Sequence, residues 1–144
     1  RADKQQELVH YVINSIGEKW ERPWLAETDK TWDAMHRALG DDLFDYEYRS
    51  PLHGAVLGGQ KLTPECWHII VYKTRDQVRE IAAAIATVTD EAMRERYSGV
   101  DQEQYEFDKG EDDCEATVGW FRVVRDFYQR AAEGDRAVIF SVDQ

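Results

Sequence analysis

The sequence predicts an α+β fold in which several helices cover a small, mainly antiparallel sheet. Three observations lead to this prediction. Apolar residues recur at helical spacing over much of the chain, the run 66–72 is rich in β-branched and aromatic residues, and a second short apolar run occupies 136–142. Because two strands alone make a poor sheet, we expect a third strand that the pattern does not reveal.

The first part of the chain contains two predicted helices. Residues 4–16 carry apolar side chains at helical spacing, and Gly17 follows as a stop. A connector over 20–26, with two Trp and one Pro, leads to the second helix, which Asp29 is expected to cap and Gly40 to end. The predicted buried stripe of this second helix is Trp32, Met35, His36 and Leu39.

Residues 41–64 show no clear period, but they contain Gly54-Ala-Val-Leu-Gly-Gly-Gln-Lys61, which is similar to a phosphate-binding loop. Such a loop needs Lys and Ser/Thr directly after the second glycine. Here Gln60 separates Gly59 from the lysine, and Leu62 stands where the hydroxyl should be. We therefore predict a short apolar segment that ends in a turn at Gly58.

The second part of the chain predicts a central strand, three helices and a final strand. The run 66–72 alternates two apolar faces, as expected of a strand buried on both sides. Thr74 and Gln77 form a capping box ahead of a helix, and Thr89 can cap a short helix that ends near residue 97. After an acidic loop over 101–115, a long helix reaches about residue 132 and a last strand covers 136–142. The predicted buried residues of these helices are Val78, Ile81, Ala82, Ile85, Val118, Phe121, Val124, Phe127, Tyr128 and Ala131.

Composition limits the classes of function. The 144 residues fit one domain, 1–144, and their 42% hydrophobic content with five Trp can supply its core. The net charge of −11 disfavours nucleic acid and anionic membrane surfaces as partners. The sequence shows neither an apolar run of membrane-spanning length nor a signal-peptide core, so we expect a cytoplasmic protein. Cys66 and Cys114, far apart in sequence, predict no disulfide framework.

Several segments together resemble the YfbM-like family of uncharacterised bacterial proteins, also called domain of unknown function 1877. They are the helix Asp29-Lys-Thr-Trp-Asp-Ala-Met-His-Arg-Ala-Leu39, the segment Pro51-Leu-His-Gly-Ala-Val-Leu-Gly-Gly59, the strand and helices over 67–97, and residues 121–140. The resemblance implies a soluble bacterial α+β domain and no catalytic residues to carry over. Members of that family usually begin with Met and a short strand, so we expect that residues preceding Arg1 supply the missing strand.

Cys66 and His68 lie two positions apart on one face of the predicted strand, which could form half of a zinc site. Completing this site would require Cys114, and His53 as well, to approach through folding. The tight ligand pairs of structural zinc sites are missing, and the simpler interpretation is a buried cysteine beside a hydrogen-bonded histidine. We therefore predict no cofactor and no metal. The acidic stretch 101–115 lacks the register of a calcium loop as well.

Asp29, Asp33 and His36 share one side of the second predicted helix, which is one way to orient a histidine base. The simpler interpretation is a cap, a solvated acid and a residue at the edge of the core. With His53 and Glu65 added, these residues are the candidates for a small hydrolase-like enzyme.

Two classes of function remain open at this point. The first is a non-catalytic binding or regulatory protein, such as an immunity-type inhibitor of a basic toxin, that contacts another protein through an acidic face with aromatic residues. The second is the small hydrolase. The enzyme predicts that at least two of Asp33, His36, His53, Glu65 and His68 converge in a pocket. The binding protein predicts an exposed apolar patch, for which Trp20, Trp24, Tyr46 and Tyr48 are the candidates.

Overall fold

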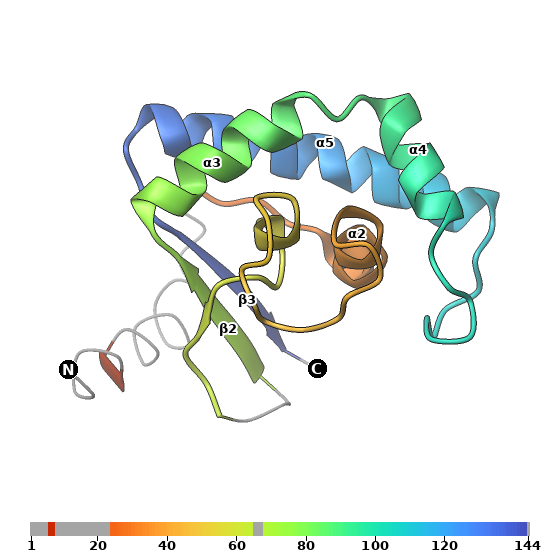
Figure 1. The fold of residues 1–144 in the computed structure, drawn as a ribbon, viewed down its shortest axis with the longest axis horizontal. Helices are drawn as coiled ribbons and strands as arrows, with labels where there is room; N and C mark the ends of the chain where they lie inside the picture. Colours follow the sequence, from red (N-terminus) through yellow and green to blue (C-terminus); the bar gives the residue numbers. More distant parts are fainter. Residues whose placement is uncertain (1–5, 8–23, 65–67, 144) are drawn as a thin grey trace.

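The computed structural model describes residues 6–7, 24–64 and 68–143 (Figure 1). The predicted helix over 4–16 lies outside these residues except for its positions 6 and 7. Trp20, Glu65 and Cys66 lie outside them too, so the candidate roles of these three residues cannot be placed in the structure.

The described part of the chain folds into helices and a three-stranded antiparallel sheet, so the α+β prediction is confirmed. The strands are β1 (Gln60–Lys61), β2 (His68–Lys73) and β3 (Val138–Asp143), in the order β1-β2-β3. Both neighbouring pairs are antiparallel, and β2 is the central strand, as predicted. The third strand is β1, inside the segment where the sequence predicted no regular structure. A strand of two residues is too short to show a period of two. The described sheet thus reaches three strands without residues from before Arg1.

The two faces of β2 are buried in different clusters, which follows from the alternation of side chains along a strand. Ile69 and Val71 join the main core between the sheet and the helices. Ile70 points to the other face, where it packs with Leu62. By the same alternation Lys73 follows Ile69 and Val71 on the inner face, and it is fully buried.

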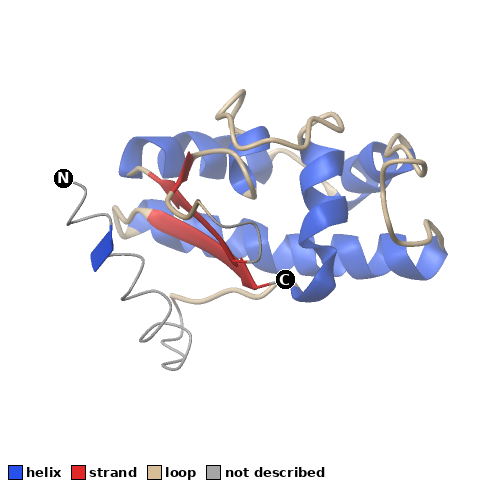
Figure 2. Cartoon of the chain, turned by 90° about the horizontal axis from the view of Figure 1, so that it is seen from below, coloured by secondary structure: helices blue, strands red, loops and turns tan. Residues whose placement is uncertain are grey.

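The helices form a layer over the sheet. Helix α2 spans Trp32–Leu39, α3 spans Arg75–Ala86, α4 spans Asp90–Ser98 and α5 spans Glu111–Glu133. In Figure 1, α3 and α5 lie side by side above β2 and β3, and α2 is seen nearly end-on beneath α4 and α5. Figure 2 shows that the sheet covers one end of this layer, while the helices continue beyond it. None of the helices in the described ranges is both long and apolar enough to cross a bilayer.

The core stripes that the helical period predicted are confirmed. Val78, Ile81, Ala82 and Ile85 of α3 are buried, as are the predicted residues of α5 apart from Phe127, which is half-buried. These side chains meet because α3 packs along α5. The α3–α5 pair therefore lies behind the loop that follows α2.

Two predicted helix starts are wrong. Asp29 does not cap α2, because it begins a short 3₁₀ turn, η2 (Asp29–Thr31), with φ of 50°, and α2 starts only at Trp32. Helix α5 starts at Glu111, inside the stretch predicted to be an acidic loop. Glu111, Asp112 and Asp113 occupy its first turn, where carboxylates interact favourably with the amino end of the helix dipole. The loop before α5 is correspondingly shorter.

The predicted capping box of α3 is confirmed, and it provides a test of local stability. The Thr74 hydroxyl oxygen accepts from the Gln77 amide at 3.1 Å, and the Gln77 side-chain oxygen accepts from the Thr74 amide at 2.9 Å. We expect Thr74→Ala to lower the free energy of unfolding by about 1 kcal/mol, measured by urea denaturation. Thr74→Ser keeps the hydroxyl and should retain most of the stability. If Thr74→Ala and Thr74→Ser lose the same amount, the hydroxyl is not the source of the effect.

Candidate functional site

Two of the candidate residues, His36 of α2 and His53 of the 3₁₀ turn η3 (His53–Ala55), converge in the structure. Their ring centroids are 4.6 Å apart in a T-shaped arrangement, and their exposed fractions are 0% and 1%. The Nε2 atoms lie 3.1 Å (His36) and 2.8 Å (His53) from the same backbone oxygen, that of Leu43. We call His36 and His53 the histidine pair.

The hydrogen bonds fix the protonation of the histidine pair. A carbonyl oxygen only accepts, so both Nε2 atoms carry a hydrogen and donate to Leu43. The Nδ1 atom of His36 accepts from the Leu57 amide at 3.3 Å, which requires that it carry no proton. Burial, followed by the charge that His53 would carry if protonated, lowers the pKa of His36 to about 3. His36 is therefore neutral near pH 7.

A second buried donor, Lys73, holds the glycine-containing loop. Its Nζ donates to the backbone oxygens of Val56 and Gly58, the latter at 2.9 Å. Complete burial lowers the pKa of Lys73 well below its usual value. The hydroxyl of Tyr128, on α5, donates to the oxygen of Ala55 at 2.7 Å. Sequence reasoning did not select Lys73, although the alternation of β2 placed it on the buried face.

These contacts explain why the glycine loop is not a phosphate site. The lysine that reaches the loop comes from β2 and meets carbonyl oxygens, whereas a phosphate loop presents amide groups. Lys61 lies over the ring of Tyr46, with its Nζ 4.7 Å from the centroid. A Cβ atom at Gly54 would overlap the ring of Tyr48, and one at Gly58 would lie 2.8 Å from the Nδ1 of His53. The two glycines therefore make room for neighbouring side chains.

The two other pocket candidates that the structure describes, Asp33 and His68, have partners outside the histidine pair. Asp33 of α2 forms an ion pair with Arg37 at 2.6 Å, and its pKa is raised by burial against the opposing effect of Arg37. His68 lies at the far end of β2, where its Nε2 is 3.1 Å from the hydroxyl oxygen of Ser141. Among the described residues no three His, Cys, Asp or Glu side chains gather in a way that could hold a metal ion.

The outer side of the loop after α2 is acidic and carries exposed apolar side chains. The carbonyl of Leu43 points inward to the histidine pair, while its residue is 47% exposed. Phe44, 39% exposed, lies against Trp32 with ring centroids 6.0 Å apart, and the Arg37 guanidinium stands 4.4 Å from its ring centroid. The loop before α5 adjoins this segment, because the Asp101 amide donates to the Asp42 carboxylate at 3.2 Å.

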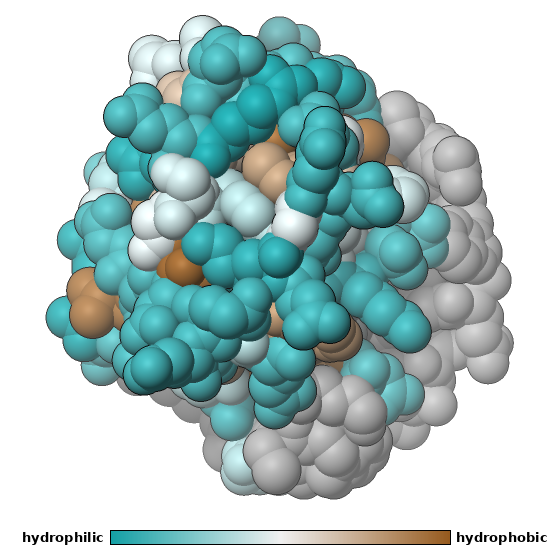
Figure 3. Space-filling model, turned by 90° about the vertical axis from the view of Figure 1, so that its right-hand side faces the viewer, coloured by the Kyte–Doolittle hydropathy of each residue, from teal (hydrophilic) through white to brown (hydrophobic). Residues whose placement is uncertain are grey.

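We define the acidic face as the acidic and apolar residues of these two adjoining loops. Its apolar members are Leu43, Phe44 and Phe107, and Phe107 is 44% exposed. Figure 3, a view toward the end of the molecule that carries α4 and the loop before α5, shows a mostly hydrophilic surface with scattered apolar residues. The acidic members are Asp41, Asp42, Asp45, Glu47, Asp101, Glu103, Glu106 and Asp108.

Of the four aromatic residues predicted for an exposed patch, the three that the structure describes are half-buried. Tyr46 and Tyr48 are half-buried and pack on the core, and the Tyr48 hydroxyl donates to Glu80 at 2.7 Å. Trp24 is half-buried beneath the guanidinium of Arg136, 3.7 Å from its ring. The exposed apolar residues of the acidic face are instead aliphatic or phenylalanine side chains.

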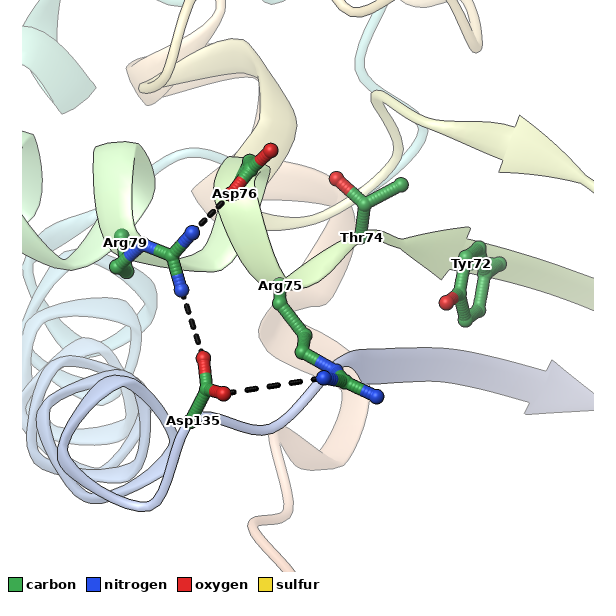
Figure 4. Close-up of a pocket in the computed structure, with 6 residues that line it drawn as sticks. All are labelled: Tyr72, Thr74, Arg75, Asp76, Arg79 and Asp135. Atoms are coloured by element: carbon green, nitrogen blue, oxygen red, sulfur yellow. Dashed lines mark hydrogen bonds and ion pairs between the residues drawn. The ribbon is translucent and has the colours of Figure 1, made fainter.

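A shallow pocket lies at the corner between the sheet and α3 (Figure 4). Its two arginines are matched by two aspartates: Asp135 lies 2.7 Å from Arg79 and 3.8 Å from Arg75, and Asp76 pairs with Arg79. None of the candidates selected from the sequence lines this pocket. Its lining residues are Tyr72, Thr74, Arg75, Asp76, Arg79 and Asp135.

The fold and this site define a small α+β domain whose glycine-containing loop is held from inside by buried donors. The model of a family described as a domain of unknown function (DUF1877) matches residues 1–141, so the chain belongs to that family. No curated protein and no solved structure matches the chain.

Proposed function

We propose that this protein is a non-catalytic binding protein of the bacterial cytosol that contacts a basic partner protein through the acidic face. An immunity-type inhibitor of a basic toxin is one concrete form. The observation that carries the proposal is that two adjoining loops together contain eight carboxylates and three exposed apolar side chains. Carboxylates of this density steer a cationic partner, and central apolar residues supply contact area.

The basic residues within the two loops neutralise only part of this charge. The amine of Lys109 donates to the backbone oxygens of Ser98 and Val100, at 3.0 and 2.7 Å. The Arg49 guanidinium is bonded to Asp45, with its shortest N–O distance 2.7 Å. Arg96 also lies 3.7 Å from Asp41, but the eight carboxylates of the acidic face outnumber Lys109, Arg49 and Arg96, so a net negative charge remains.

The alternative, a small hydrolase that uses His36, His53 and Glu65, has less support. Both imidazoles are buried and donate to a backbone carbonyl, so neither is in position to take a proton from a substrate. The bacterial and cytosolic setting of the proposal rests on the family resemblance and on composition.

Pull-down from a lysate of the source cells tests the proposal. The bait is the full chain, compared with a variant that neutralises three exposed acids of the acidic face, Glu103→Gln, Glu106→Gln and Asp108→Asn. We expect the wild-type bait to retain a protein of net positive charge, and the variant to bind that purified protein about tenfold more weakly at low salt. The difference should shrink as salt is added, because screening reduces steering between exposed charges.

The control neutralises three exposed acids outside the acidic face, Glu27→Gln, Asp126→Asn and Glu133→Gln. It has the same net charge as the test variant and should bind like the wild type. Equal loss of binding in both variants would mean that the overall charge of the protein, and not the acidic face, determines binding. Equal binding by all three baits would contradict the acidic face as the binding surface.

A further inference from the structure

We propose that the histidine pair is a pH-sensitive device: when neutral it holds the Leu43–Phe44 turn against the core, and when protonated it releases the loop that joins α2 to β1. The device goes beyond the proposed function and acts without a partner. Only its consequence for binding rests on that function.

Geometry requires that both rings be neutral in the closed loop. The single carbonyl of Leu43 has two lone pairs and accepts one Nε2–H from each histidine. Protonating His36 would place a hydrogen on Nδ1, directly opposite the amide hydrogen of Leu57. Protonating His53 would place a hydrogen on its Nδ1, a buried atom without a hydrogen-bond partner among the described residues. An added proton would thus face the Leu57 amide at His36 and would have no hydrogen-bond partner among the described residues at His53.

The charged groups around the pair do not remove this conflict. From β2, the Lys73 amine adds positive charge next to His36 if it is protonated. From the loop itself, Asp45 lies 3.4 Å from the His53 Nε2 and would attract a protonated ring. That carboxylate is shared with Arg49, which holds it at 2.7 to 3.2 Å. On α2, the guanidinium of Arg37 is matched by Asp33.

Release would change the acidic face directly, because the turn that the histidine pair holds carries two of its apolar residues. Besides the long-range bonds from Lys73 and Tyr128, which a protonated histidine pair leaves in place, local backbone hydrogen bonds close the loop. They include Gly58 amide to His53 oxygen at 3.1 Å and Gly59 amide to Tyr46 oxygen at 2.9 Å. These amides, with that of Leu57, report whether the loop is open.

Amide hydrogen exchange by NMR on the full chain, at about pH 7.5 and about pH 5.5, tests the inference. After correction for intrinsic exchange rates, we expect the opening constant at Leu57, Gly58 and Gly59 to rise by about tenfold because the ring of His36 must stay neutral in the closed loop. Amides in the centre of α5 should change much less. The ring nitrogen shifts of His36 should show the neutral Nε2–H form at the higher pH.

The matched variant is His53→Gln, whose side-chain amide can place a donor near the position of Nε2 but cannot take up a proton. We expect its loop amides to respond less to acid than those of the wild type, because one of the two rings that hold Leu43 can no longer be protonated. If this variant does not fold, amide exchange and the ring nitrogen shifts of the wild-type protein still test the inference. Loop amides that respond to acid no more than those of α5, or a His36 ring protonated on both nitrogens near neutral pH, would overturn the inference. Because no partner is added, these results are independent of the binding experiment.

Discussion

The free energy of unfolding is expected to rise between about pH 7 and about pH 9, and Lys73→Met is expected to abolish most of that rise. Lys73 is fully buried, and its Nζ donates to two backbone oxygens. Burial lowers its pKa in the folded protein well below 10.5, the value of an unperturbed lysine. A neutral amine can still donate both hydrogen bonds, so the fold does not need the charge.

The direction of this change in stability follows from the numbers of protons that the folded and unfolded chains bind. Between its folded pKa and 10.5, Lys73 carries a proton in the unfolded chain but not in the folded chain, so folding releases this proton and raising the pH favours folding. Between the folded pKa and 10.5 the slope is up to about 1.4 kcal/mol per pH unit. His36 contributes to this slope only near pH 7, because its unfolded pKa of 6.5 lies just below the interval. The raised pKa values of Cys114 and Tyr128 oppose the rise only near and above pH 9.

Urea denaturation of wild type and Lys73→Met at several pH values across this interval gives the measurement. The control, Lys30→Met, removes an exposed lysine and should keep the wild-type slope. The absolute stability of Lys73→Met carries less information, because the oxygens of Val56 and Gly58 lose a donor while the cost of burying an amine disappears. Parallel pH profiles for wild type and Lys73→Met would mean that the amine is charged inside the fold.

Elements that bury one whole face could be predicted from the sequence. The buried residues of α3 and its capping residue Thr74 occur at fixed spacing along the chain, and both features were predicted correctly. Elements that depend on contacts between distant residues could not be predicted from the sequence. Strand β1 forms because Gln60 and Lys61 pair with β2, and two residues leave no pattern of their own. Asp29 has cap chemistry, but its backbone enters a 3₁₀ turn instead.

The histidine pair and Lys73 could likewise be predicted only in part from the sequence. The position of His36 in the apolar stripe of α2 already indicated burial, but its partner His53 follows 17 positions later in a loop without a period. Only the path of that loop brings both rings to the carbonyl of Leu43. Lys73 was within reach of sequence reasoning, because continuing the alternation of Ile69 and Val71 places it inside. The predicted strand ended at residue 72, so the charged residue that follows it was not included.

The second large effect is expected at Gly58, where Gly58→Ala should lower the free energy of unfolding by about 2 to 3 kcal/mol. A Cβ atom at this position would lie 2.8 Å from both the Nδ1 and the backbone oxygen of His53, and 2.9 Å from the backbone oxygen of Glu47. Two of these three atoms belong to the backbone and cannot rotate away. The methyl group therefore has to push η3 or the preceding turn outward, which also strains the hydrogen bond from His53 to Leu43.

Gly119→Ala is the matched control, since the same methyl group is added inside α5, where a Cβ would have no atom within 4 Å. This change should stabilise the protein by about 0.5 to 1 kcal/mol, because alanine loses less backbone entropy than glycine in a helix. The two variants should therefore move the urea midpoint in opposite directions. A Gly58→Ala protein as stable as wild type would show that the loop can move away from His53 at little cost. In that case close packing around the histidine pair would not be what fixes the Leu43 turn.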